Sequence, residues 1–175
     1  VLLRRNWEIQ RRIAGETGAA TLEAAGALSV VLSALGRRRE AEALQRDSLA
    51  VLRRTRGETH PQTLSMAGDL AVSLIEMGRP VEAEVLLRQV VAGLRSVRGP
   101  ESPDTLNAMN NLAGALNQQG RRAEAEALYR EVWLIRKRTR GDAHPDTLLS
   151  AANLADALGF PRRPKEAMEL NSDVL

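Results

Sequence analysis

The chain has 175 residues and a net charge of +3, with 43% hydrophobic and 27% charged residues, a balance typical of a folded domain and not of a disordered chain. Aromatic residues make up only 2%, so the core must be built from Leu, Ala, Val and Met, and the abundance of Leu and Ala favours helices over strands. The absence of cysteine excludes disulfides and thiolate metal sites within this sequence, and no apolar run approaches the ~20 residues that a membrane-spanning helix needs.

The predicted elements follow an internal repeat. The pair Thr-Leu begins at residues 21, 63, 105 and 147, a spacing of 42 residues without a single insertion. Glu-Ala recurs with the same period at 40, 82, 124 and 166, and Arg-Gly at 56, 98 and 140. Such a period indicates a repeat architecture in which neighbouring units cover each other's apolar faces. The chain is therefore predicted to be a single array, divided into residues 1–18, 19–60, 61–102, 103–144 and 145–175.

Residues 1–18 are predicted to be the second helix of a truncated unit. Val-Leu-Leu-Arg at 1–4 parallels the same four residues at 85–88, and Trp7 falls at the repeat phase of Trp133. We expect this helix to end before Gly15, at the phase of Gly99. Because the unit is incomplete, we also expect further repeats or another domain of the same chain beside it.

The three full units are each predicted to form two antiparallel helices. The first helix opens at Pro61 or Pro103 in the later units, where proline suits the first helical position, and it ends at a Gly C-cap. The second helix carries a small Ala at 41, 83 and 125, where the two helices should pack closely. In the unit 103–144 it closes at Gly141 after the cations Arg136, Lys137, Arg138 and Arg140, and its predicted apolar stripe is Ala125, Leu128, Tyr129, Val132, Ile135 and Thr139.

The last unit, 145–175, departs from the pattern at its inter-helix turn. Residues 159–164 read Gly-Phe-Pro-Arg-Arg-Pro, and two prolines should end the first helix early and stiffen the turn. We expect either a terminal adaptation of the array or a contact between Phe160 and a partner.

These residues resemble the tetratricopeptide repeat. Leu112-Ala113, Leu116, Gly120, Ala125 and Tyr129 match its consensus. The 42-residue unit, with Asn-Asn-Leu-Ala at 110–113 and His-Pro-Asp-Thr-Leu at 144–148, is similar to the kinesin light chain class of these repeats. The resemblance covers essentially the whole chain. It implies an all-α, right-handed α-solenoid of antiparallel helix pairs, whose first helices line a concave groove that binds a protein or peptide partner.

The resemblance also implies which side chains line the groove. In the family, an Asn six residues after the repeat Thr often hydrogen-bonds the backbone of an extended peptide; Asn111 and Asn153 match this position, whereas Asp69 departs from it. An amide suits the role because it donates and accepts at once. The candidate peptide-binding residues are Asn107, Asn110, Asn111, Asn117, Gln118, Asn153, Asp156 and Asp69.

The four Asn residues between 107 and 117 have a second interpretation, as a solvated helix face. Asn is a poor helix former that prefers caps and turns, so four of them in one helix lower its stability without an evident structural return. This loss favours a binding role.

Other chemistry has little support in the sequence. His60 and His144 precede proline at one repeat phase and cluster with nothing, which favours a structural role in the turn over a metal or catalytic role. The Arg runs at 37–39, 121–122 and 162–163 are interleaved with Glu, which argues against a nucleic-acid surface. No Gly-rich phosphate loop, G-x-S-x-G or H-E-x-x-H motif is present, so we expect no enzyme activity and no cofactor or metal.

Three functions remain open from the sequence. The favoured one is a scaffold that binds a peptide or protein segment in its groove. The second is a structural spacer or oligomerisation arm of a larger multidomain protein, and the third is an Arg-mediated nucleic-acid surface. Without a signal peptide or a membrane segment in the sequence, we expect a cytoplasmic location.

Overall fold

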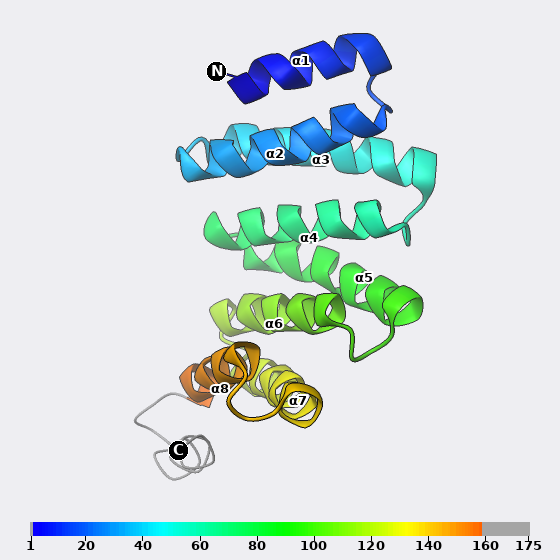
Figure 1. Cartoon of the computed structure of the whole chain (residues 1–175). Coiled ribbons are helices and arrows are strands. Elements are labelled where there is room, and N and C mark those ends of the chain that lie inside the picture. Colours follow the sequence, from blue (N-terminus) through cyan, green and yellow to red (C-terminus); the bar gives the residue numbers. More distant parts are fainter. Residues whose placement is uncertain (1, 159–175) are drawn as a thin grey trace. The chain divides into compact units, whose positions relative to one another are not determined.

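The computed structural model describes residues 2–158, and these form eight α-helices without a strand (Figure 1). Of the described residues, those up to Val97 form one compact unit and residues 98–158 belong to a second. The prediction of an all-α helical repeat solenoid is confirmed, and no helix in the described part is both long and apolar enough to cross a membrane. The helices are α1 (Leu2–Ala14), α2 (Ala19–Ala34), α3 (Arg38–Arg56), α4 (Pro61–Glu76), α5 (Pro80–Arg98), α6 (Pro103–Gln118), α7 (Arg122–Arg140) and α8 (Pro145–Leu158).

Short-range side-chain contacts start the first helices where the prolines predicted. The imidazole Nδ1 atoms of His60 and His144 accept hydrogen bonds from the backbone N–H groups of Gln62 and Asp146, at 3.2 and 3.1 Å. At the same phase, the Ser102 hydroxyl accepts from the Thr105 N–H at 3.2 Å. These bonds satisfy N–H groups that a helix start leaves without an intrahelical partner. The two histidines are therefore helix N-caps.

Glycine ends the first helices through one repeated turn. Gly36, Gly78 and Gly120 have φ angles of 74°, 72° and 78°, in the left-handed region that favours glycine. At the first of these turns the Arg37 N–H bonds the Leu32 carbonyl at 2.8 Å, and the Gly36 N–H bonds the Ser33 carbonyl at 2.9 Å. This is the Schellman arrangement, and the other two turns repeat both bonds.

The recurring Thr of the repeat has a structural role that its spacing did not show. The buried hydroxyls of Thr21 and Thr105 donate to the carbonyls of Gly15 and Gly99, both at 2.8 Å, and so tie each first helix to the end of the preceding second helix. The hydroxyl oxygens of Thr63 and Thr147 are buried without a hydrogen-bond partner among the described residues.

In the first unit, small residues allow close helix packing. Ala41 and Ala83 are fully buried, as their recurrence predicted, and the equivalent Ala167 lies outside the described residues. A Cβ added to Gly93 of α5 would lie 2.6 Å from Cδ2 of Leu64, so α4 and α5 approach closely at this glycine. The fit of helix on helix therefore depends on residue size at these positions.

In the second unit, α7 packs against both α6 and α8, and the predicted stripe is only partly right. Ala125, Tyr129 and Val132 are buried as predicted. Thr139 is exposed, in the last turn of α7, where its hydroxyl donates to the Ile135 carbonyl at 2.8 Å. One turn earlier, Arg136 is buried; the sequence had placed it only among the cations that follow the helix dipole at the helix end.

The turn at 159–164, Phe160 and the predicted second helix of the last unit lie outside the described residues.

Candidate functional site

Seven of the eight candidate residues lie on two first helices of the second unit. Asn107, Gln118 and Asp156 are exposed, and the others are partly exposed. Both helices, α6 and α8, pack on α7. We call this set the amide face; its members are Asn107, Asn110, Asn111, Asn117 and Gln118 of α6 with Asn153 and Asp156 of α8.

Two amides of this face are in direct contact. Nδ2 of Asn153 donates to Oδ1 of Asn110 across a distance of 3.0 Å. The bond joins α6 to α8 and leaves the carbonyl of Asn153 and the amino group of Asn110 without a partner among the described residues. Candidate residues 43 positions apart in sequence are therefore neighbours on one surface.

The amide oxygen of Asn107 accepts a hydrogen bond from a buried arginine on the neighbouring helix α7. The Arg136 side chain of α7, whose residue is only 5% exposed, donates to Oδ1 of Asn107 at 2.6 Å. It also donates to the Ser150 hydroxyl at 2.7 Å and the Asp146 carbonyl at 3.2 Å, both on α8. Burial lowers the pKa of Arg136, partly offset by the charge of Asp146. These acceptors stabilise a cation whose burial would otherwise be costly.

Other groups of the amide face have unused hydrogen-bonding capacity. The side chains of Asn111, Asn117, Gln118 and Asp156 have no hydrogen-bond partner among the described residues. The hydroxyl of Tyr129 lies 3.4 Å from the point where a Cβ on Gly114 would sit. Burial, and secondly the charge of Asp156, raises the pKa of this Tyr. The face therefore offers donors and acceptors to a ligand.

The eighth candidate, Asp69, lies on α4 in the first unit and has no hydrogen bond or ion pair within the described residues. Its side chain is open to solvent, yet the surrounding protein raises its pKa by desolvation.

Of the arginine runs that suggested a nucleic-acid surface, Arg37, Arg38 and Arg121 form ion pairs with Glu40, Glu76 and Glu124, and residues 162–163 lie outside the described residues. Arg37 bonds Glu40 at 2.6 Å, and Arg4 reaches the same carboxylate from α1 at 2.7 Å. One repeat later, Arg79 bonds Glu82 at 2.6 Å and Arg46 reaches it from α3 at 3.1 Å. Two arginines on each of these glutamates leave less free positive charge for phosphate.

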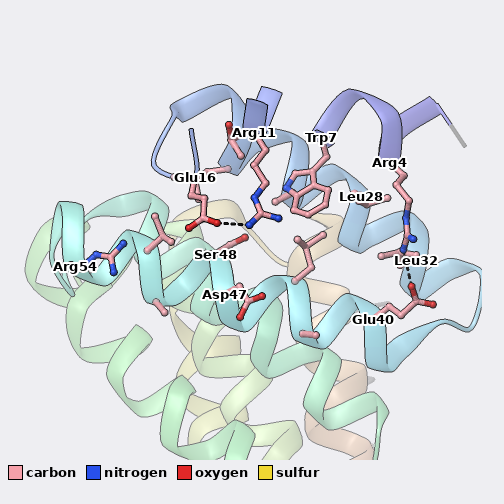
Figure 2. A pocket seen from close by; sticks show the side chains of 17 residues that line it. Arg4, Trp7, Arg11, Glu16, Leu28, Leu32, Glu40, Asp47, Ser48 and Arg54 are labelled. Carbon is pink, nitrogen blue, oxygen red and sulfur yellow. Dashed lines mark hydrogen bonds and ion pairs between the residues drawn. The ribbon is translucent and has the colours of Figure 1, made fainter. Parts of the chain in front are cut away.

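A pocket that sequence reasoning missed lies in the first unit, between α1, α2 and α3 (Figure 2). Its volume is about 500 Å³, and its floor includes Leu28 and Leu32 of α2. Trp7 lies between two ion pairs: Arg4–Glu40 joins α1 to α3, and Arg11–Glu16 joins α1 to the turn that follows it. The Arg11 guanidinium lies 5.4 Å from the Trp7 ring centre. The pocket depends on the separation of helices α1 and α3, for which the sequence carries no signal.

The family follows from comparison with known proteins. One tetratricopeptide repeat model matches residues 105–146 and another matches residues 31–96. The chain is also similar to two crystal structures of a Podosopora anserina protein described as a kinesin light chain with nearly identical TPR-like repeats. The TM-scores are 0.88 for a variant form and 0.86, each with 30% identity over 99% of this chain and 82% of that chain. The chain belongs to the kinesin light chain-like tetratricopeptide repeat proteins.

A more distant structure supports the fold of this repeat protein. BtubC (BKLC) from P. vanneervenii matches with a TM-score of 0.79 and 15% identity, over 98% of this chain and 70% of that chain. A search of curated protein sequences gives no match. Tetratricopeptide repeats are generally protein-interaction modules, and this scaffold fold is typically non-enzymatic. No group of three or more His, Asp or Glu in residues 2–158 could hold a metal ion.

The structure also shows which functional signal the sequence analysis overlooked. At the repeat phase of Arg136 the two preceding units carry Leu52 and Leu94, both buried. The sequence thus shows an arginine where the two preceding units have leucine. This arginine is the buried residue that donates a hydrogen bond to Asn107 of the amide face.

Proposed function

We propose that this repeat protein is an interaction scaffold that holds an extended segment of a partner protein on the amide face. The observation that carries the proposal is the Asn153–Asn110 hydrogen bond, because it brings amides of two successive first helices within reach of one ligand. Exposed amides with free donors and acceptors match the alternating N–H and C=O groups of a peptide backbone.

Asn111 and Asn153 are the residues proposed to make the main hydrogen bonds to that peptide backbone. Asn111 is partly exposed and has no internal partner among the described residues, so binding would cost it no existing hydrogen bond. Asn153 retains a free carbonyl beside its bond to Asn110. Each hydrogen bond to a ligand contributes about 0.5–1.5 kcal/mol.

The experiment is a titration of a partner segment, identified by crosslinking through the amide face, against matched variants. Asn111→Ala plus Asn153→Ala should weaken binding roughly ten-fold. Arg121→Ala plus Arg122→Ala, at the start of α7, should leave it nearly unchanged at physiological salt. If the Arg pair governs the affinity, and the affinity falls steeply with salt, a phosphate-binding surface replaces the proposal.

A second candidate function is a spacer or oligomerisation arm, in which the five predicted repeat segments form one array beside further repeats or another domain of a cytoplasmic protein. The supporting observation is apolar exposure on the first two helices: Leu2, Ile13 and Leu35 are 83%, 73% and 66% exposed. Light scattering of the purified protein tests it. If Leu2→Glu plus Leu35→Glu turns an oligomer into a monomer, the oligomerisation arm is supported; a wild-type monomer contradicts the oligomerisation arm, though not a spacer.

A further inference from the structure

We infer that Arg136 fixes the direction of the Asn107 amide, so that the α6 side of the amide face offers a hydrogen-bond donor to the ligand at this position. This inference rests on the proposed function and deepens it, because it states which atoms of a bound segment must face α6.

The direction follows from the chemistry of the two groups. A guanidinium has five N–H donors and no acceptor, so it can bond Asn107 only through the carbonyl oxygen. The 2.6 Å contact therefore joins Arg136 to Oδ1, and the opposite amide orientation would set N–H groups against N–H groups. With its oxygen held by Arg136, Asn107 has its Nδ2 amino group left for a ligand.

The neighbouring pair extends the pattern. Oδ1 of Asn110 accepts from Asn153, so the amino group of Asn110, like that of Asn107, has both of its N–H groups left for a ligand. Asn153, on α8, keeps a free carbonyl. Asn107 and Asn110 thus present their amino groups as donors, and Asn153 presents its carbonyl as an acceptor. A complementary ligand is an extended peptide segment that directs backbone carbonyl oxygens toward Asn107 and Asn110 and an N–H group toward Asn153.

Packing alone does not explain why an arginine occupies this place. The equivalent positions hold the buried leucines Leu52 and Leu94, and apolar residues usually stabilise such sites at least as well as a buried charge. The partners differ from the preceding repeat as well. Ser150, which accepts from Arg136, stands where that repeat has Ala108. Arg136 on α7 and its acceptor Ser150 on α8 thus depart from the pattern together.

Two substitutions separate the donor role from the structural role. Asn107→Asp keeps an acceptor for Arg136 but removes the outward donor. Arg136→Leu restores the residue of the other repeats and releases the amide. Arg138→Leu is the matched control, because Arg138 is exposed and, among the described residues, its side chain bonds only Glu101, at 2.6 Å.

The probe is the uncharged blocked peptide acetyl-Thr-Val-Thr-Val-Thr-amide, followed through the Asn side-chain N–H signals in NMR spectra of the whole chain. We expect the signals of Asn107, Asn111 and Asn153 to shift together. Asn107→Asp should weaken binding roughly two- to ten-fold without lowering the melting temperature. Arg136→Leu should weaken it about two-fold, since a free amide presents its donor about half of the time. Arg138→Leu should bind as the wild type does.

Two results overturn the inference and leave the proposed function standing: wild-type affinity in Asn107→Asp, or an Asn107 signal that stays still while those of Asn111 and Asn153 move. If no amide signal of the wild type responds to the peptide, the proposed function fails, and the inference that depends on it fails as well.

Discussion

Asn153 of α8 donates a hydrogen bond to Asn110 of α6 over 3.0 Å, and this contact ties together two helices that both pack on α7. The same two residues belong to the surface that we propose binds a partner. Their side-chain amides therefore serve two purposes: they stabilise the packing of α6 and α8, and they are available to bind a ligand. Stability and binding must therefore be measured separately for each variant.

The first prediction concerns this pair. A double-mutant cycle of Asn110→Ala and Asn153→Ala should show a coupling free energy of unfolding of about 0.5–1.5 kcal/mol, because either single change already removes the bond. Urea unfolding measures it. The control cycle pairs Asn153→Ala with Asn117→Ala, which have no mutual bond among the described residues, and should be additive. Additivity in both cycles would show that the Asn110–Asn153 bond does not form in solution.

The second prediction concerns the recurring threonines. Thr105→Val should lower the free energy of unfolding by about 0.5–1.5 kcal/mol per hydrogen bond, because it removes the 2.8 Å bonds that the hydroxyl makes with the Gly99 carbonyl and with the Ser102 hydroxyl. Thr147→Val should be neutral or stabilising, because the Thr147 hydroxyl is buried without a partner among the described residues. Valine has nearly the shape and helix propensity of threonine, so the comparison isolates the hydrogen bond. Equal losses in the two variants, measured by chemical denaturation, would contradict this account.

The third prediction concerns the packing of α7. Ala125 is fully buried, so Ala125→Leu should overpack this site and destabilise the protein by about 1–3 kcal/mol. The control is Ala123→Leu, on the same helix but exposed, which should change the stability little. Thermal melts of the two variants give the answer, and an unchanged melting temperature for Ala125→Leu would mean that the helix phase is wrong.

The fourth prediction concerns pH. Hydrogen bonds from Arg37 and Arg4 lower the pKa of the Glu40 carboxyl below its ordinary value of 4.5. A carboxyl whose pKa is lower in the folded state stabilises the fold above its unfolded pKa, and this contribution is lost as the pH falls through the folded pKa. Stability should therefore decline below about pH 4.5, and Glu40→Gln should make the decline shallower. The groups are exposed, so the effect should be small and should shrink in high salt. Melting curves across pH 3–7 at two salt concentrations would reveal it, and identical slopes for variant and wild type would contradict it.

The sequence by itself determined the helix pairs and their limits. Prolines at helix starts and glycines at helix ends act on neighbouring residues, so Pro61, Pro103, Gly78 and Gly120 placed the ends of α4 and α6 without knowledge of the fold. The repeat likewise indicated that Ala125 would be buried, because an Ala recurs at this phase, and Ala41 and Ala83 are buried as well.

Only the tertiary structure decided which polar residues touch. The burial of Arg136, its hold on Asn107 and the Asn110–Asn153 bond depend on how α6, α7 and α8 pack in three dimensions. Their partners lie 29 and 43 residues apart, a separation at which local propensity has no influence. The repeat phase is enough to predict that residue 136 faces a neighbouring helix. It does not show that Asn107, Ser150 and the Asp146 carbonyl lie opposite and accept hydrogen bonds from a buried arginine. For this reason the amide face was visible in the sequence, and the hydrogen-bond direction of its members was not.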